Sequence, residues 1–400
     1  MVQAAVFGFG TVGSGVVEIL DKNAGQIARR VPGGLNLKYI LDIREFPDSP
    51  YGDKVVHDID QILNDPEIRV VCETMGGKEP AYTFTKKALE KGISVCTSNK
   101  ELVEHKGAEL LEIAREHHCS YLFEAAVGGG IPLIMPMLNC LEQEKITSIT
   151  GILNGTTNYI LTRMEQENAE FGDVLKQAQE LGYAERNPEA DVEAHDTGRK
   201  IAILASLLTG KSVRFNDLHV EGITKITPTD LAVAAEHGFR VKLLCVCKDM
   251  GEGLAVYAAP HLVGSDSPLY AVNDVFNAVL FHGNMVDDLM LYGRGAGKLP
   301  TGSAVVADMV TAVGHDGEGV QIRWSSEVET PAPFEECVNE FYVRADKADA
   351  DRVRKALADN ILEDWTKEDA VFITGAMTEG EFAAKTAGEP LKQVIRIYRK

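Results

Sequence analysis

Hydrophobic positions in the first part of the chain form short apolar runs separated by helix-length amphipathic segments. Residues 2–7 are an apolar run that ends in Gly8-Phe-Gly10-Thr-Val-Gly13, and residues 14–20 have helical periodicity. Further segments alternate as strand 37–43, strand 70–73, helix 81–91, strand 94–97, helix 106–117 and strand 121–124. This alternation predicts an α/β domain with a doubly wound parallel sheet over residues 1–135.

The pattern changes after Ile131-Pro132. Runs such as 146–153, 243–247 and 254–258 alternate in the manner of antiparallel strands between longer helices, which predicts an α+β domain over residues 136–300. A glycine-rich loop, 293–302, precedes a predicted helix with Ser303 near its start. We expect residues of about 300–315 to complete the first domain.

The last part of the chain has a third pattern. Residues 316–337 are polar and contain prolines, so we interpret them as a linker. Residues 338–400 then give strand 340–345, helix 347–359, strand 361–365, strand 370–375, helix 379–387 and strand 392–398. This order predicts a ferredoxin-like βαββαβ domain.

Composition excludes several classes of partner. Forty Lys and Arg against sixty Asp and Glu leave a formal net charge of −20, which repels nucleic acid and anionic membrane surfaces. No apolar run approaches the roughly 18 residues that a membrane span needs. The N-terminus has no secretory pattern, and the seven scattered cysteines lack metal or redox spacing, so we expect a cytoplasmic protein.

The glycine motif indicates dinucleotide binding. Gly8, Gly10 and Gly13 lie between a predicted strand and a predicted helix, the context in which such glycines permit a tight turn and a close approach to pyrophosphate. Asp42, at the end of the second strand, is placed to bind a ribose 2′-hydroxyl and favour NAD. Arg44 is placed to bind the 2′-phosphate of NADP, and these residues alone leave the choice open.

Residues 182–208 carry the strongest candidate chemistry. Asp196 and Lys200 are four residues apart, so on a helix they share a face with Val192, Leu204 and Leu207. A surface ion pair is the ordinary interpretation of such spacing. Because the two charges interrupt an apolar stripe, we favour a pair that lines a catalytic or substrate cleft.

Three further segments leave alternatives open. Lys100, after the strand 94–97, is either a solvated loop lysine or a ligand at the carboxyl end of a strand. Residues 124–132 (EAAVGGGIP) form either a plain turn or an oxygen cage for a cation. Residues 154–158 (NGTTN) form either a hydrogen-bonded turn or a polar cleft wall. No zinc, Walker A or serine-hydrolase spacing appears.

Taken in order, these motifs resemble the homoserine dehydrogenase family. The resemblance rests on Gly8–Gly13, Asn99-Lys100, EAAVGGGIP at 124–132, GILNGTTNYIL at 151–161, GYAE…DV…D…K at 182–200 and GRGAGKLPTGSAVVAD at 293–308, and covers about 310 residues. It implies a Rossmann-type first domain, a catalytic and dimerising second domain, and reversible NAD(P)H-dependent reduction of L-aspartate 4-semialdehyde to L-homoserine. This reaction lies on the route to threonine and methionine.

The resemblance also implies roles for individual residues. Lys200 and Lys100 become the acid/base candidates, Asp196 orients Lys200, and Glu185 receives the substrate ammonium. The other expected substrate contacts are Asp191, Lys100, Asn154 and Thr156. The expected cofactor contacts are Gly8, Phe9, Gly10, Thr11, Val12, Gly13, Asp42, Arg44, Asn99, Lys100 and Gly297. A monovalent cation, Na⁺ or K⁺, is implied at Glu124, Val127, Gly129 and Ile131.

The chain departs from the family pattern at a few positions. Asn187-Pro188 stands where the family usually has Asp-Pro, and Ala194 where it usually has Gly, which puts details of the substrate loop in question. The usual basic residue near Leu41 is absent, which favours NAD through Asp42. The tail resembles an ACT domain but lacks the Pro-Gly turn before its first helix, so threonine inhibition and a dimerising or structural tail are both open.

We therefore expect a monofunctional, homo-oligomeric enzyme, a dimer or tetramer. Two alternatives remain at this stage. One is a non-catalytic regulator that binds a dinucleotide and senses an amino acid, although such a sensor has no need of a buried Asp196–Lys200 pair. The other is a related semialdehyde or hydroxy amino acid dehydrogenase on the same scaffold.

Overall fold

The computed structural model describes residues 1–315 and 319–399, and the chain forms two compact units. The first unit comprises Met1–Glu144, Ala202–Phe215 and Leu291–Glu329, and the second comprises Lys145–Ile201, Asn216–Met290 and Thr330–Lys400. No helix among the described residues is both long enough and apolar enough to cross a membrane.

The first unit contains a six-stranded sheet in the order β3-β2-β1-β4-β5-β6, and every pair in it is parallel. The strands are β1 (Val2–Phe7), β2 (Leu35–Leu41), β3 (Val55–Val56), β4 (Ile68–Glu73), β5 (Ser94–Thr97) and β6 (Tyr121–Leu122). The main helices are α1 (Thr11–Lys22), α4 (Ala81–Glu90), α5 (Lys100–Glu116) and α12 (Lys298–Gly314), with shorter α2 (Ala24–Ile27), α3 (Asp60–Leu63) and α6 (Ile134–Asn139). The expected parallel sheet is confirmed.

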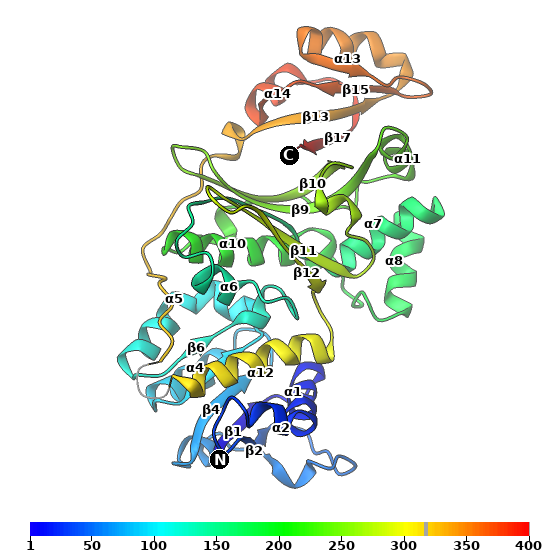
Figure 1. The fold of residues 1–400 in the computed structure, drawn as a ribbon. Helices are drawn as coiled ribbons and strands as arrows, with labels where there is room; N and C mark the ends of the chain where they lie inside the picture. The colour runs from blue at the N-terminus through cyan, green and yellow to red at the C-terminus, as the bar shows by residue number, and fades with distance from the viewer. Residues whose placement is uncertain (316–318, 400) are drawn as a thin grey trace. The chain divides into compact units, whose positions relative to one another are not determined.

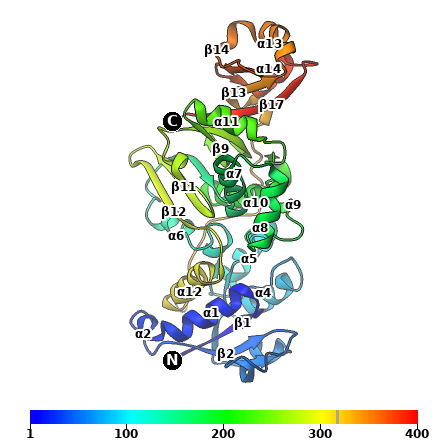
Figure 2. The same ribbon diagram turned by 90° about the vertical axis from the view of Figure 1, so that its right-hand side faces the viewer.

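Helix α12 returns from late in the sequence to pack beside α1, as Figures 1 and 2 show. Glycines allow the close approach: a Cβ atom at Gly15 would lie 2.3 Å from the carbonyl oxygen of Lys298, and one at Gly302 would lie 3.0 Å from Gly15. Any larger residue at Gly15 would push the two helices apart.

Two helices begin earlier than the sequence pattern predicts. Helix α5 starts at Lys100, where 106 was predicted, because the Asn99 side chain accepts a hydrogen bond from the Leu102 N–H and caps the first turn. Helix α12 starts at Lys298, before Ser303, and Gly297 precedes it with a φ of 121°. Both predicted starts were wrong: the Asn99 cap sets the start of α5 ahead of the apolar periodicity, and α12 begins directly after Gly297 with no side-chain cap.

The second unit is built around a mixed sheet of eleven strands. Nine strands follow the order β12-β11-β7-β9-β10-β17-β13-β15-β14, while β8 pairs with β10 and β16 pairs with β13. The strands before the tail are β7 (Ile146–Ile152), β8 (His219–Val220), β9 (Phe239–Asp249), β10 (Leu254–Gly264), β11 (Phe276–Gly283) and β12 (Asp287–Arg294). Neighbours among β11, β7, β9 and β10 are antiparallel, as predicted for the α+β region.

Helices pack on one face of these strands, where Figure 1 shows α7 and α11. The helices are α7 (Gly155–Glu167), α8 (Phe171–Glu180), α9 (Glu189–Val192), α10 (His195–Thr209), which extends into the first unit, and α11 (Pro228–Glu236). Apolar residues of α7, including Ile160 and Met164, share a core with Val241 and Leu243 of β9. This core holds α7 against β9, and the N-cap of α7, Asn154, belongs to the candidate site.

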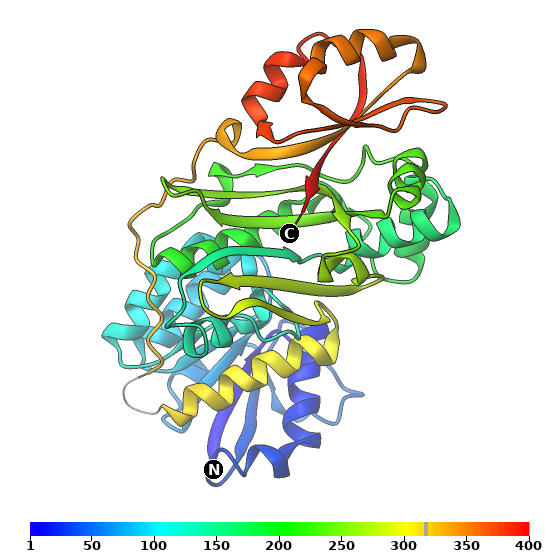
Figure 3. The same cartoon turned by 45° about the horizontal axis from the view of Figure 1, so that its top comes forward.

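The C-terminal residues have the predicted βαββαβ order, with one additional two-residue strand before the second helix. The elements are β13 (Val338–Ala345), α13 (Ala350–Leu357), β14 (Ile361–Asp364), β15 (Ala370–Thr374), β16 (Met377–Thr378), α14 (Glu379–Lys385) and β17 (Leu391–Tyr398). Phe341 and Val343 of β13 pack with residues of α13 and α14, which lie together beside these strands in Figure 3. The ferredoxin-like fold of the tail is confirmed.

The tail belongs to the same sheet as the middle strands because β17 pairs in parallel with β10. Of the predicted linker, residues 316–318 lie outside the described residues, and residues 330–337 belong to the second unit. The boundaries expected for three domains, 1–135, 136–300 and 338–400, stay a prediction.

Candidate active site

A buried cluster of polar groups lies at the start of α10. The Lys200 Nζ is 2.8 Å from the Asp196 Oδ2, and it also donates to the carbonyl oxygen of Leu153 at 2.7 Å. Lys200 is 8% exposed and Asp196 is 5% exposed, while Val192, Leu204 and Leu207 on the same face are buried. Burial distinguishes this i,i+4 pair from a surface ion pair, since it holds the ammonium in a defined orientation.

Asn154 joins this pair to a second carboxylate. Its side-chain Nδ2 donates to Asp196 Oδ2 at 2.9 Å and to Asp191 Oδ1 at 2.7 Å. Its Oδ1 accepts the N–H of Thr157 and so caps α7. The structure therefore places Asn154 as a bridge between two acids, and the substrate contact that the resemblance implies for it stays a prediction.

The segment expected to hold the substrate runs from Tyr183 to Ala194. The Glu185 side chain is exposed, and the hydroxyl of Thr156 donates to the carbonyl of Tyr183 at 2.6 Å. Ala194 has a φ of 63°, so the position that the family usually gives to glycine keeps a left-handed backbone here. Pro188 precedes α9, which carries Asp191.

The glycine turn between β1 and α1 fits a dinucleotide. Gly8 has a φ of 90°, and a Cβ at Gly13 would lie 1.9 Å from the Gly8 carbonyl oxygen, so both positions require glycine. A Cβ at Gly10 would meet no atom within 4 Å, which leaves the N-terminus of α1 open. Thr11 begins the helix and is exposed, with Val12 next to it, an arrangement that suits a pyrophosphate.

Asp42 and Arg44 form a pair at the end of β2. Asp42 Oδ2 accepts the N–H of Phe9 at 2.8 Å, and Arg44 donates through Nε and Nη2 to the same carboxylate at 2.9 Å each. The Arg44 hydrogen bond holds the pKa of Asp42 near 2 despite its burial. The acid is therefore ionised and tied to the glycine turn.

Lys100 lies in the first turn of α5, next to its cap Asn99, whose Nδ2 donates to the Gly77 carbonyl at 2.6 Å. Glu73, at the carboxyl end of β4, connects the ends of β4 and β5 beside this helix. The sequence analysis did not identify it. Glu73 accepts from the Thr97 hydroxyl and the Met75 N–H, both at 2.7 Å, and burial raises its pKa. A charge at the end of the apolar run 70–73 was the available signal.

Glu124, the expected cation ligand, is buried. Its carboxylate accepts backbone N–H groups of Leu133, Ile134 and Met135 at 2.5, 2.8 and 2.8 Å. Its own N–H donates to Asp308 of α12 at 2.9 Å, and burial raises the pKa of both carboxyls, that of Asp308 well above its usual range. Asp308 was also missed, although a charge within the apolar stretch AVVADMV was a signal.

The loop after Glu124, where the cation site is expected, turns sharply. Gly129 has a φ of 59°, and a Cβ there would lie 2.0 Å from the Gly295 carbonyl oxygen. Val127 and Ile131 are buried. Gly297, an expected cofactor contact, lies in the glycine-rich loop that packs against this turn, where Gly130 donates to the Arg294 carbonyl at 3.0 Å.

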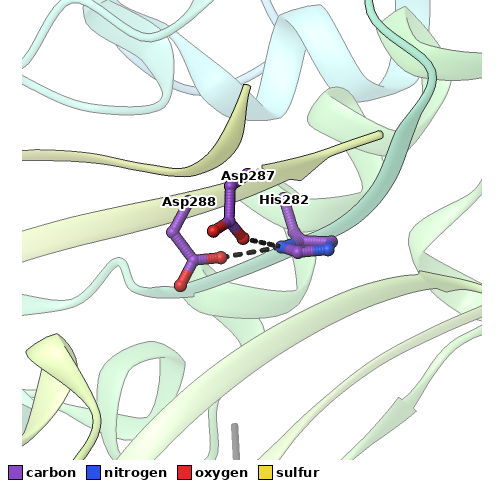
Figure 4. A group of neighbouring side chains, drawn as sticks. All are labelled: His282, Asp287 and Asp288. Atoms are coloured by element: carbon purple, nitrogen blue, oxygen red, sulfur yellow. Dashed lines mark hydrogen bonds and ion pairs between the residues drawn. The ribbon is translucent and has the colours of Figure 1, made fainter. Parts of the chain in front are cut away.

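A separate group of possible metal ligands lies on β11 and β12, shown in Figure 4. The His282 Nδ1 is 2.7 Å from Asp288 Oδ1 and 3.5 Å from Asp287 Oδ1. The side chains of His282 and Asp287 are 45% and 78% exposed, so histidine–carboxylate contacts at a surface account for the group. We assign it no metal.

The comparisons with known proteins agree with these features. Profiles described as "Homoserine dehydrogenase, NAD binding domain" and "Homoserine dehydrogenase" match residues 8–124 and 132–310. A homoserine dehydrogenase of Synechocystis sp. is 41% identical over 353 residues, which are 85% of this chain and 78% of that protein.

Solved structures extend the likeness to the tail. A homoserine dehydrogenase from Thiobacillus denitrificans superposes with a TM-score of 0.91 at 32% identity, over 99% of this chain and 98% of the other. A hyperthermophilic archaeal homoserine dehydrogenase in complex with NADPH superposes with a TM-score of 0.65 at 25% identity, over 78% of this chain and 97% of the other. The chain therefore belongs to the homoserine dehydrogenase family of NAD(P)-dependent oxidoreductases.

Proposed function

We propose that the cluster of Lys200, Asp196, Asp191 and Asn154 carries the proton chemistry of L-homoserine oxidation and of L-aspartate 4-semialdehyde reduction. The observation that supports this most is the burial of the Lys200–Asp196 pair, with the ammonium also held by the Leu153 carbonyl. A pair buried in this way keeps a proton donor at a fixed position, which a solvated lysine does not.

A bound nicotinamide supplies or accepts the hydride. In the reductive direction the aldehyde oxygen becomes an alkoxide, and the Lys200 ammonium stabilises this charge and donates its proton to it. Asp196 stabilises the cationic form of Lys200 before the transfer. In the oxidative direction Lys200, as the neutral amine, accepts the proton of the substrate hydroxyl.

Other residues bind and orient the substrate in this proposal. Lys100, in the first turn of α5, serves as the second acid/base group, and the exposed Glu185 carboxylate receives the substrate ammonium. The Asp191 carboxylate forms part of the wall on which the substrate lies. Asn154 holds Asp191 and Asp196 at hydrogen-bond distance from one amide, so that both acids keep their positions.

We propose NAD as the preferred cofactor, bound at the ribose by Asp42. Asp42→Asn is then expected to raise the dissociation constant of NAD by about 10–100-fold, since a hydrogen bond to a charged group contributes about 1.5–3 kcal/mol. The change in NADP affinity is expected to be small. Nucleotide titrations measure both constants, with Asp48→Asn, an exposed acid of the same loop, as the control.

An equal loss for NAD and NADP in Asp42→Asn would contradict the ribose contact. It would show that Asp42 acts by holding the Phe9 N–H and the glycine turn.

We propose that a monovalent cation, Na⁺ or K⁺, binds at Glu124 and the backbone oxygens of Val127, Gly129 and Ile131. Two buried acids lie near this loop: the Glu124 carboxylate accepts the N–H groups of residues 133–135, and the Asp308 carboxylate accepts the N–H of Glu124. A cation beside them would balance negative charge. The site thus fits a hard cation by the chemistry of its donors.

Assembly, regulation and location are further parts of the proposal. We infer a homo-oligomer, a dimer or tetramer, and threonine as a feedback inhibitor through the tail, whose βαββαβ order supports an ACT-like role. All seven cysteines are free thiols, which supports a cytoplasmic location. Rates of L-homoserine oxidation measured with and without L-threonine test the feedback inhibition. Rates measured with KCl replaced by choline chloride test the monovalent cation.

Substrate identity is tested by comparing kcat/KM for L-homoserine with that for L-serine and L-threonine at saturating cofactor. We expect L-homoserine to be preferred by at least about 100-fold, since a displaced hydroxyl loses alignment with Lys200. Equal turnover of a 3-hydroxy amino acid would instead identify a related dehydrogenase.

A further inference from the structure

The geometry of the Lys200–Asp196 pair depends on a two-residue segment between β7 and α7. Leu153 provides the carbonyl that accepts from Lys200, and Asn154 provides the amide that donates to Asp196. Because β7 ends at Ile152 and α7 begins at Gly155, this segment moves whenever the start of α7 moves. Whatever holds the first turn of α7 therefore also sets the position of the acid/base pair.

The first turn of α7 is held against residues 272–277. A Cβ at Gly155 would lie 2.8 Å from the Val275 carbonyl oxygen, so the helix backbone lies very close to this loop. One turn into the helix, Asn158 donates through its Nδ2 to the carbonyls of Val272 at 3.2 Å and Phe276 at 3.0 Å. Asn158 itself donates its N–H to the carbonyl of Asn154.

Lys242 of β9 completes this arrangement. It is only 2% exposed, and its Nζ lies within hydrogen-bond distance of three oxygens: Asn158 Oδ1 at 3.2 Å, Val272 O at 2.5 Å and Asn273 Oδ1 at 3.1 Å. Three acceptors match the three N–H donors of an ammonium. All three acceptors are neutral, so hydrogen bonds to uncharged oxygens, and no direct ion pair among these contacts, hold the ammonium.

A buried lysine of this kind is costly to keep. Burial, and after it the nearby Arg240, lowers the pKa of Lys242 to about 7, although Glu165 and Asp274 act in the opposite direction. An apolar side chain would fill the same volume without this penalty. The desolvation penalty of Lys242 is explained if its three hydrogen bonds hold α7 and the 272–273 loop together, which a methionine side chain could not do.

We propose that Lys242 is a positioning residue for the acid/base pair. Its ammonium joins Asn158, in the first part of α7, to the 272–273 loop, and so keeps Leu153 and Asn154 where they bind Lys200 and Asp196. This inference rests on the roles proposed above for Lys200 and Asp196. We therefore expect substitution of Lys242 to lower kcat by displacing Lys200, and to leave cofactor binding unchanged.

The test begins with Lys242→Met, which keeps the length of the side chain and removes the donors. We expect kcat for L-homoserine oxidation to fall about 10–100-fold, the range for lost outer-shell support and misplacement of about 1 Å, with KM for the cofactor unchanged. Lys248→Met, on an exposed position of the same strand, is the matched control and should keep its kcat.

A double variant distinguishes positioning from a general loss of folded enzyme. If Lys242 acts through Lys200, then Lys200→Ala with Lys242→Met has the same kcat as Lys200→Ala alone. A purely structural role would lower the residual rate of Lys200→Ala by a further factor equal to the one seen in the wild-type background, and this would overturn the proposal.

Further outcomes keep the two proposals separate. Normal kcat in a folded Lys242→Met overturns the positioning role while leaving Lys200 untouched. Near-normal kcat in Lys200→Ala overturns the proposed function itself, whatever Lys242→Met does. If Lys242→Met does not fold, Asn158→Ala removes the acceptor from the other side; it should lower kcat by a similar factor, and an unchanged kcat would reject the proposal.

Discussion

Replacing Lys200 by alanine is expected to lower kcat for L-homoserine oxidation by about 10²–10⁴-fold, the range for loss of a general acid or base. The physical reason is that the ammonium is fixed between Asp196 Oδ2 and the Leu153 carbonyl, and alanine has no proton donor to place at that point. Affinity for the cofactor should persist, because the glycine turn and Asp42 belong to the other compact unit. Steady-state rates and a dinucleotide titration measure the two effects.

The control for this variant is Lys211→Ala. Lys211 follows the same helix and pairs with Glu327 and Glu329, but its side chain is 37% exposed, so we expect kcat to change less than twofold. Far-ultraviolet circular dichroism establishes that both variants are folded. A Lys200→Ala enzyme that turns over at near the wild-type rate would remove Lys200 from the mechanism.

Arg344→Met is expected to lower the free energy of unfolding by about 3–5 kcal/mol, the cost of breaking a buried ion pair from one side. Arg344 donates through Nε and Nη2 to both oxygens of Asp230, at 2.7 and 3.0 Å, and through Nη1 to Asp369 at 2.8 Å. Asp230 is fully buried at the start of α11, so the variant leaves a carboxylate with no guanidinium. Chemical denaturation followed by circular dichroism measures the loss.

Arg354→Met is the matched control for Arg344. Arg354 pairs with Asp351 and Asp364 on α13 and β14, but its side chain is 44% exposed, so we expect a loss of about 1 kcal/mol or less. Equal losses in the two arginine variants would show that the tail is not held to α11 by the Asp230 pair. Arg344→Lys should lower the free energy of unfolding by less than Arg344→Met but more than Arg354→Met, because lysine cannot bind both oxygens of Asp230 at once.

Much of the fold follows from local patterns in the sequence. The run 2–7, the glycines after it and the helix that follows are each specified by neighbours in the chain, and β1 and α1 form where predicted. Asp196 and Lys200 could be placed on one helix face from their spacing alone, since i and i+4 side chains always meet. The βαββαβ order of the tail is equally local.

The contacts that organise the site could not be predicted in this way. Asn154 bridges Asp191 and Asp196 across 37 and 42 residues, and the Glu124 N–H meets Asp308 across 184. Lys242 also interrupts an apolar run, but the run alone does not show which oxygens accept its hydrogen bonds, since these come from residues 158, 272 and 273. Such contacts depend on how strands and helices are brought together, which no short-range pattern encodes.

Helix starts illustrate the same limit at short range. The predicted start of α5 missed Lys100 because the apolar periodicity begins later than the Asn99 cap. As a result, the sequence placed Lys100 ahead of the helix, as a loop lysine or as a ligand at the end of a strand, whereas it occupies the first turn of the helix. Interpreting Asn99 as an N-cap would have predicted the correct start of α5 and would have placed Lys100 in its first turn.

As a member of the homoserine dehydrogenase family, the chain is expected to oxidise L-homoserine with NAD or NADP. The most direct test is the initial change in absorbance at 340 nm when the purified protein is mixed with L-homoserine and either cofactor, in parallel reactions containing KCl. We expect a rise with at least one cofactor, faster with NAD. No rise with either, from a folded protein shown by titration to bind the dinucleotide, would contradict it.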